Sequence, residues 1–335
     1  MSQRQTWIDV LKGIGILTVV VGHISFNQNL VGLIQMFHMP LFFLAGGWLH
    51  DTRATQGVYA MNKARTLLQP YVCFLIILWP LESLMSAPAG TALTLGQLAP
   101  PMLFGGRWLN GAAGPLWFLT CYFLTGQLAH CLLRNCSTAV WALAGAALLG
   151  AAYLGAWLFP GWMLPWSAEV VLFAAPLYLL GYAARGLDLA RWGALWLALS
   201  LAGAALFLAH LPGLTNTLDM KSGVYGIPLL TLLSSLGMVA VLALFSQRIA
   251  ATRAGRVFAA LGAASMTILA VHQLVQLFIA KELGIMQAGP RIIGALVVSY
   301  GVHLLLEQWP PAARLFLGRR KAQSAAAAQQ PQVAA

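Results

Sequence analysis

The chain has 335 residues, of which 60% are hydrophobic and only 8% are charged, and its net charge is +11. Soluble domains carry about 25% charged residues, so this composition argues against a soluble protein and indicates an integral membrane protein. The positive charges lie in links between apolar segments rather than on one basic face, so we expect no nucleic-acid partner.

The first apolar segments are Ile8–Ile24 and Leu30–Leu49, joined by the short polar link Ser25–Asn29. Each is about long enough to cross a bilayer as a helix. Ionisable side chains are costly inside a membrane and are therefore functional candidates. These segments contain four of them: Asp9, Lys12, His23 and His38.

The spacing of Lys12 and His23 places them on one helix face. They are eleven residues apart, and eleven steps of about 100° return to within roughly 20° of the start, with an axial separation of roughly 16 Å. This geometry suits a long, thin ligand with an anionic end at Lys12 and a reactive end at His23. The alternative is that Lys12 snorkels to the membrane surface and that His23 caps a helix end.

The sequence IDVLKGIGILTVVVGH followed by FHMPLFFLAGGWL resembles acyltransferase family 3, the membrane O-acyltransferases of bacterial surface sugars, and within it the fucose 4-O-acetylase and enterobacterial common antigen O-acetyltransferase branch. The family motif is a basic residue, ten intervening residues and a histidine, which Lys12 and His23 match. Looser matches are NKARTLLQPY, PLWFL and SMTILAVHQL. Many members have Arg at the position of Lys12, and Lys does not offer bidentate phosphate binding.

Further along the chain, we expect a polar loop at His50–Arg65, a third span at Leu67–Met85, and a long link rich in Pro and Gly at Ser86–Gly114. A link of this length is either functional or mobile. The fold class is therefore an all-α bundle of about ten transmembrane helices in a single domain over residues 1–321, with a disordered cytoplasmic tail over 322–335. The remaining expected spans are Pro115–Leu133, Ala139–Leu158, Ala168–Ala184, Trp192–His210, Tyr225–Phe245, Val257–Ala280 and Arg291–Glu307.

The distribution of Lys and Arg among the links predicts that both termini of this multi-pass protein are cytoplasmic. The family resemblance implies that the membrane is the bacterial inner membrane. With that orientation, His23, Glu82, Glu169 and His272 share one depth band near the outer side, although the sequence alone does not show that they touch. His38 is interpreted as a satisfied core histidine. Three histidines at span ends are expected to face water or headgroups: His50, His130 and His210.

The motifs of other enzyme classes are missing from the sequence. No spacing suggests a zinc site, no Gly-rich loop precedes Lys-Ser or Lys-Thr, and no Gly-x-Ser-x-Gly elbow occurs. We expect no metal and no P-loop or serine acyl-enzyme chemistry.

The resemblance implies a membrane O-acetyltransferase that moves an acetyl group from cytoplasmic acetyl-CoA to a hydroxyl of an envelope sugar or glycan. On this hypothesis the CoA phosphates meet Lys12, Lys63 and Arg65, and His23 acts as general base. Glu82, Glu169 or His272 would orient its imidazole, and an acetyl-histidine relay stays open.

The acceptor is left open between a lipid-linked sugar, a polysaccharide and a small glycoside. Candidates to contact it are Trp108, Asn110, Trp162 and Trp166. The alternative function is a proton-coupled secondary transporter or flippase, with His23 and Glu169 as a proton relay. Besides the lipid bilayer and these substrates, the sequence indicates no partner, and it does not specify an oligomeric state.

Overall fold

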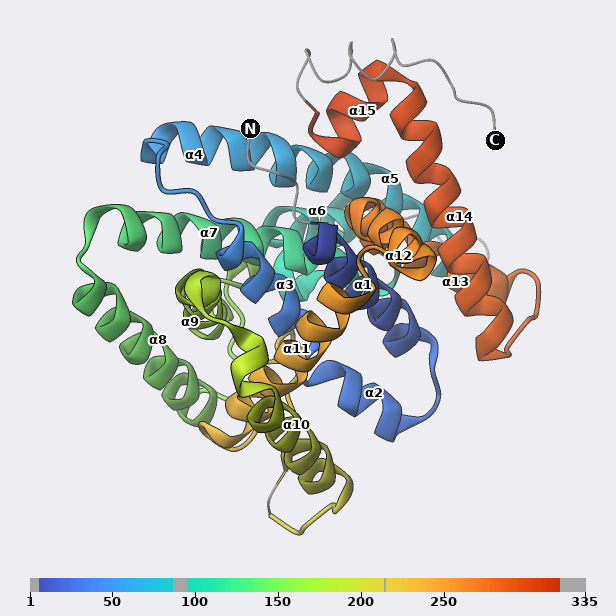
Figure 1. Ribbon diagram of the computed structural model, residues 1–335. Helices are drawn as coiled ribbons and strands as arrows, with labels where there is room; N and C mark the ends of the chain where they lie inside the picture. The colour runs from blue at the N-terminus through green and yellow to red at the C-terminus, as the bar shows by residue number, and fades with distance from the viewer. Residues whose placement is uncertain (1–5, 87–94, 214, 320–335) are drawn as a thin grey trace.

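The computed structural model describes residues 6–86, 95–213 and 215–319 (Figure 1). These residues form helices and a single isolated β-bridge between Asp219 and Val224, with no sheet. Within the described residues, nine helices are long and apolar enough to cross a membrane, or ten if a bent pair is counted as one span. This confirms the predicted class, a helical multi-pass membrane protein.

Helix α1 (Thr6–Ile24) lies at the centre of the bundle (Figure 1). It packs against α3 (His38–Trp48), α11 (Leu230–Ile249), α12 (Arg253–Ala263) and α13 (Ser265–Lys281). In its most apolar stretch of 18 residues, 61% is buried inside the protein. The helix that carries Lys12 and His23 is therefore positioned by protein neighbours rather than by lipid.

Three apolar helices lie at the periphery: α8 (Thr138–Leu158), α10 (Gly193–Leu208) and α14 (Ala288–Gln308) (Figure 1). In the most apolar 18-residue stretch of each span, only 11%, 6% and 22%, respectively, is buried inside the protein. Apolar side chains that face outward so extensively are stable in a hydrocarbon environment, so these helices form the lipid-facing rim.

Two glycines allow α12 to cross α1 at very close range. A Cβ at Gly13 would overlap the carbonyl of Phe258, and a Cβ at Gly262 would overlap the carbonyl of Asp9. Small residues permit such an approach of two helix backbones in a membrane protein. The crossing fixes the start of α1, where Lys12 lies.

Two predicted spans differ from regular straight helices in the structure. The expected span Val257–Ala280 is wrong as a single helix, because α12 and α13 meet at a bend of 77°. The run Leu30–Leu49 lies in one candidate membrane span, Gln28–Trp48, as predicted, but its helix is interrupted between α2 (Gln28–Gln35) and α3, which begins at His38. Pro40 explains this second break, since its ring clashes with the carbonyl of the residue four positions earlier and ends a regular helix there.

The predicted loop His50–Arg65 is wrong beyond Thr55. Thr55 caps α4 (Gln56–Lys63), which continues through the π-helical turn Ala64–Leu68 into α5 (Gln69–Ser86). Pro70 has no N–H to donate to the preceding turn, and the widened π turn occurs directly before it.

The described part of the predicted link Ser86–Gly114 is folded rather than irregular. It contains α6 (Leu95–Phe104) and η2 (Gly106–Trp108), and it leads into η3 (Gly111–Leu116). The predicted disordered tail, 322–335, lies outside the described residues. The other elements are α7 (Trp117–Asn135), η4 (Pro165–Ser167), α9 (Val171–Ala183), η5 (Ala184–Gly186), η6 (Leu189–Trp192) and α15 (Pro310–Leu317).

Candidate functional site

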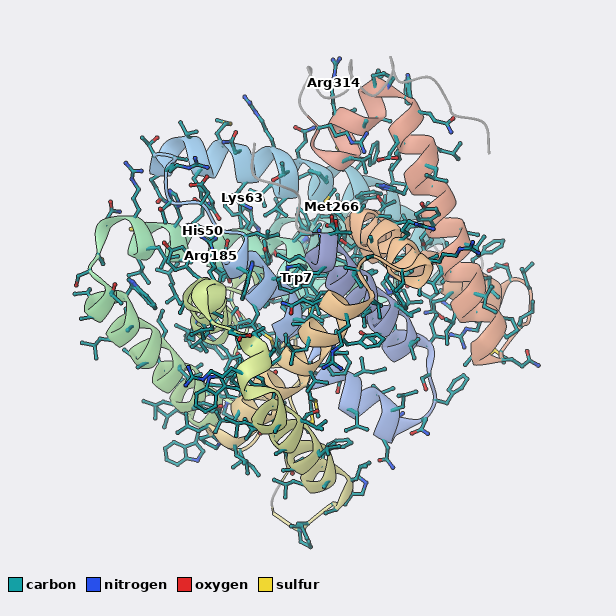
Figure 2. The ribbon with its side chains drawn as sticks, viewed as in Figure 1. Trp7, His50, Lys63, Arg185, Met266 and Arg314 are labelled. Carbon is teal, nitrogen blue, oxygen red and sulfur yellow. The ribbon has the colours of Figure 1, made fainter. Side chains whose placement is uncertain are left out.

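A cavity of about 510 Å³ lies between α1, α3, α4, α7, α9 and α13, and we call it the lysine cavity. Two of the predicted site residues, Lys12 and Lys63, line it together with Asn62. His50, Lys63 and Met266, labelled in Figure 2, are three of the residues around it. Its apolar wall is formed by Ile16, Met39, Phe42, Phe118, Leu119 and Leu269.

Both lysines of this cavity have a neighbour that holds them in place. The Nζ of Lys12 lies 2.9 Å from Oδ1 of Asp9, one helical turn before it. The Nζ of Lys63 lies 5.5 Å from the centre of the Tyr59 ring, in a cation–π contact. Because two lysines line a largely apolar cavity, it suits a ligand with an anionic end and a less polar arm.

Arg65 lies apart from the two lysines. It is exposed and lines a separate surface hollow with Leu68, Gln69 and Val72. The π turn begins directly after Lys63 and carries Arg65 to that hollow. The structure therefore brings Lys12 and Lys63 to one cavity but not Arg65.

The predicted depth band does bring His23 and His272 together. Their ring centroids are 5.2 Å apart with the planes inclined by 50°. His272 is fully buried on α13, whereas His23 is exposed at the end of α1. Leu269 lines the lysine cavity, and His272 lies about one helical turn beyond it on the same helix.

The tautomer of His272 is fixed by its surroundings. Its Nδ1 lies 2.8 Å from the carbonyl oxygen of Ile268, which can only accept, so Nδ1 carries the proton. Its Nε2 is therefore a lone-pair acceptor, and this buried atom has no hydrogen-bond partner. A buried, oriented and unused proton acceptor beside His23 is the most distinctive feature of this region.

Two residues near His23 were not assigned to the site from the sequence. His38 donates from Nδ1 to the carbonyl of Ile34 at 2.8 Å, as expected of a satisfied histidine, but it is only half-buried. Lys221, from the link before α11, lies within electrostatic range of His23 and donates to the carbonyl of Leu109 at 3.0 Å. Burial lowers the pKa of Lys221, and Asp219 partly offsets this effect. No sequence spacing relates Lys221 to His23, because the two lie about 200 residues apart.

Glu82 lies where α5 meets η3. Its carboxylate accepts a hydrogen bond from the N–H of Ala112, and a Cβ at Gly111 would overlap it. Since η3 packs directly on α13, Glu82 fixes a segment that supports the helix of His272.

Glu169 is 7% exposed and belongs to a different cluster. Its Oε2 accepts from the N–H of Leu164 at 2.9 Å, and its Oε1 lies 3.9 Å from a guanidinium nitrogen of Arg107. Arg107 also donates to the carbonyl of Trp162 at 2.9 Å. Among the described residues, these contacts of Glu169 do not include His23. Glu169 and Arg107 line a second cavity of about 140 Å³, which we call the arginine cavity.

His50 and His130 do not face water or headgroups, so that prediction was wrong. They are 4% and 0% exposed, respectively. His130 donates from Nε2 to the carbonyl of Ala54 at 3.1 Å and accepts at Nδ1 from Nε2 of His50 at 3.1 Å. Nδ1 of His50 then accepts from the hydroxyl of Tyr178 at 3.0 Å. Each proton in this chain has one consistent position.

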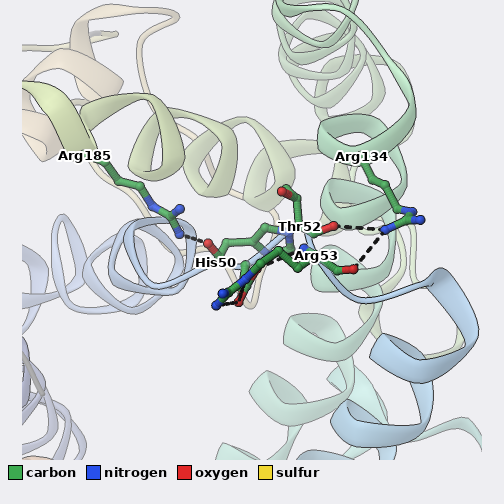
Figure 3. Close-up of polar contacts among 6 residues, drawn as sticks. His50, Thr52, Arg53, Arg134 and Arg185 are labelled. Carbon is green, nitrogen blue, oxygen red and sulfur yellow. Dashed lines mark hydrogen bonds and ion pairs between the residues drawn. The ribbon is translucent and has the colours of Figure 1, made fainter. Parts of the chain in front are cut away.

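Two arginines hold the loop after α3 against this network (Figure 3). Arg134 of α7 donates to the carbonyls of Thr52, at 3.1 Å, and Ala54, at 2.7 Å. Arg185 of η5 donates to the carbonyl of His50. Because His50 and Asp51 line the lysine cavity, the arginines fix its rim. The network was missed from the sequence because span-end positions usually face solvent.

The titrations of the two rim residues follow from these contacts. Burial, followed by the charge of His130, lowers the pKa of His50 to about 4. Hydrogen bonding to Arg53 lowers the pKa of Asp51 to about 2. Near neutral pH, His50 is therefore uncharged and Asp51 is ionised.

Within the described residues, no three His, Cys, Asp or Glu side chains are placed to share a metal ion.

Comparison with known proteins finds a family model that matches most of the chain and one relative that matches part of it. The acyltransferase family 3 model, described as an acyltransferase domain, matches residues 5–307. The chain is similar to nodulation protein NolL of Mesorhizobium japonicum, with 26% identity over 162 residues. This match covers 43% of the chain and 40% of NolL, so it spans about two fifths of that relative. No solved structure matches.

Proposed function

The chain belongs to acyltransferase family 3, and we propose that it is an O-acetyltransferase that moves an acetyl group from cytoplasmic acetyl-CoA to a hydroxyl of a cell-envelope sugar or glycan. Family membership favours acyl transfer over the transporter or flippase alternative. The proposed setting is the bacterial inner membrane with both termini cytoplasmic, which rests on the distribution of Lys and Arg.

The observation that carries the proposal is the course of the lysine cavity. It is lined by Lys12 and Lys63 and by an apolar wall that includes Ile16 and Leu269, and His272 follows Leu269 by about one turn of α13. In the proposed complex the CoA phosphates lie at the two lysines, and the pantetheine arm follows the apolar wall toward His23 and His272. Arg65 is left out of this donor site, because it lines a different hollow.

In the proposed reaction, neutral His23 accepts the proton of the acceptor hydroxyl. The hydroxyl oxygen forms a bond to the acetyl carbonyl carbon, the carbon–sulfur bond of the thioester breaks, and CoA leaves as a thiolate. The protonated imidazole returns its proton to that thiolate, so the products are an acetyl ester and CoA. The exposed position of His23 supports its role as base, because an acceptor can reach it.

We assign His272 a positioning role. Its Nε2 is a buried lone-pair acceptor beside the ring of His23, so it can accept the N–H of that ring and present the other nitrogen to the acceptor. Glu82 supports this arrangement indirectly through η3, which packs on α13.

A glycan profile of a strain that lacks the gene tests the proposed function. The strain should lose an O-acetyl ester from an envelope glycan, expression of the wild-type chain should restore the ester, and the His23→Gln variant should not restore it. An O-acetyl profile identical to that of the parent strain would contradict the proposal.

A further inference from the structure

The arginine cavity has no role in the reaction as proposed so far. It lies where three links meet: Arg107 comes from η2, Trp162 from the link between α8 and α9, and Ser222 from the link before α11. Its volume, about 140 Å³, corresponds to roughly ten times the space that one water molecule needs. It is therefore large enough for a single sugar ring and too small for an extended chain.

The charges inside this cavity balance. The guanidinium of Arg107 lies 3.9 Å from Oε1 of Glu169, and both side chains are mostly buried, at 15% and 7% exposed. A phosphate or carboxylate ligand would face the Glu169 carboxylate at short range in a poorly screened site, which is unfavourable. The cavity therefore favours a ligand without net charge.

One polar atom in the cavity has no hydrogen-bond partner. Oε1 of Glu169 is buried and receives no hydrogen bond, although its partner atom Oε2 accepts from Leu164. A buried carboxylate oxygen without a donor is costly and is usually satisfied by a ligand or water. A hydroxyl group of a ligand would supply the missing donor.

The remaining wall combines aromatic and hydroxyl-bearing side chains. Phe159 and Trp162 contact each other with ring centroids 5.9 Å apart, and Ser222 and Tyr225, from the link before α11, also line the cavity. Aromatic faces cover the C–H face of a sugar ring, while hydroxyl and carboxylate groups bind its hydroxyls.

The link that closes this cavity is tied to the segment that carries Arg107. Ser222 lines the cavity, and its neighbour Lys221 donates to the carbonyl of Leu109. Leu109 in turn directly follows η2, which carries Arg107. A ligand in the arginine cavity is thus held between two links that are hydrogen-bonded to each other.

We propose that the arginine cavity binds one neutral sugar unit of the acceptor, with a ring hydroxyl donating to Oε1 of Glu169 and the apolar face of the ring against Trp162. This assignment rests on the proposed function, since it names the class of acceptor: a saccharide whose recognised unit carries no charge. Glu169 is on this view an acceptor-binding residue rather than the group that orients His23.

The test is a protection experiment that needs no acetyl-CoA. The variant Ser222→Cys, in lipid nanodiscs, is treated with N-ethylmaleimide in the presence of methyl glycosides of glucose, galactose, fucose and N-acetylglucosamine. Glucose 6-phosphate and glucuronate serve as charged counterparts. The exposed native Cys131, on α7, is the internal control for reagent reactivity.

At least one neutral glycoside should slow modification of the introduced thiol without slowing that of Cys131, and the charged sugars should not. Adding Trp162→Ala should raise the half-protecting concentration about tenfold, the equivalent of about 1.4 kcal/mol. The matched control Trp157→Ala, a side chain 77% exposed on the rim helix α8, should leave it unchanged. Glu169→Gln should weaken protection, because a neutral amide oxygen is a weaker hydrogen-bond acceptor than a carboxylate.

The proposal is overturned if no neutral glycoside protects, if the charged sugars protect equally well, or if Trp162→Ala behaves as Trp157→Ala does. The outcome is independent of the proposed acetyl transfer. Protection by a sugar in a protein that never consumes acetyl-CoA would refute the transferase proposal and leave the sugar site standing.

Discussion

Two cavities of the bundle, the lysine cavity and the arginine cavity, differ in size and in the charges that line them. The lysine cavity measures about 510 Å³ and is lined by Lys12, Lys63 and Asp51. Lys12 is paired with Asp9, Lys63 lies over the ring of Tyr59, and Asp51 is paired with Arg53. The arginine cavity measures about 140 Å³, and its one cation faces one buried carboxylate. A long anionic ligand fits the first cavity, and a compact neutral ligand fits the second.

The difference suggests a division of labour between donor and acceptor. The proposed reaction takes place at His23 and His272: α13 runs from the lysine cavity to His272, whose ring lies beside that of His23, and Ser222 of the arginine cavity is next to Lys221. Variants of His23, of the packing of α1 and of the lysine cavity alone therefore test this comparison.

The largest effect is expected from a change of His23. His23→Gln keeps a polar side chain but cannot accept a proton near neutral pH, so the acetyl transfer rate should fall on the order of 10²–10⁴-fold. Binding of acetyl-CoA, measured by calorimetry on the same preparation, should persist. The control is His210→Gln, an exposed histidine that contacts Asn29. Near-normal turnover in His23→Gln would remove His23 from the mechanism.

A variant that displaces α1 should destabilise the whole bundle, because α1 packs against α3, α11, α12 and α13. Gly262→Ala places a methyl group against the carbonyl of Asp9 and should destabilise the protein by about 1–3 kcal/mol. Gly301→Ala in α14 is the matched control, because nothing lies within 4 Å of the added Cβ. Thermal unfolding in detergent measures both. Equal stability of the two variants would contradict the close crossing of α1 and α12.

At the lysine cavity alone, Lys12→Ala or Lys63→Ala should weaken acetyl-CoA binding about tenfold, the equivalent of about 1.4 kcal/mol. Raising the salt concentration should weaken wild-type binding as well, because phosphate contacts near the surface are screened. Arg65→Ala is the control and should have little effect, since Arg65 lies in a separate hollow. A larger loss from Arg65→Ala than from Lys63→Ala would place the donor elsewhere.

The smallest effect is expected at the rim of the lysine cavity. The pKa of His50 is lowered from 6.5 to about 4, so between these values the unfolded chain binds more protons than the folded one. Stability should therefore fall as the pH is lowered from about 6.5 to about 4, and this contribution should be fully present above 6.5. Asp51, with its pKa at about 2, stays ionised throughout this window.

The slope of melting temperature against pH measures this effect. His50→Gln should flatten the slope, and His210→Gln should not. An unchanged slope in His50→Gln would show that His50 does not contribute to the pH dependence of the stability of the protein.

Sequence reasoning located the residues whose relation is set by one helix. Lys12 and His23 share a face because helix periodicity fixes it, and the depth estimate for His272 was good enough to place it near His23. The break before His38 was also readable, since Pro40 is present in the sequence, but the continuous apolar run outweighed that signal.

Contacts between residues that lie on links far apart in the sequence could not be predicted from it. Glu169 is paired with Arg107, and the two are joined only by the folding of separate links. His50 and His130 were expected at the surface because span ends usually are, and their burial depends on Arg134 and Arg185 holding the loop after α3. No local pattern encodes such contacts.

The central claim is that the chain moves an acetyl group onto a saccharide hydroxyl, and isotope tracing tests it most directly. Purified protein in sealed proteoliposomes is incubated with acetyl-CoA labelled with ¹³C in the acetyl group and with an envelope saccharide extract, and both substrates are followed by mass spectrometry. We predict an alkali-labile, labelled ester on the saccharide, one free CoA released per ester formed, and neither product with His23→Gln. Label that remains entirely in acetyl-CoA, while the wild-type protein carries unmodified saccharide across a sealed membrane, would contradict the account and identify a transporter.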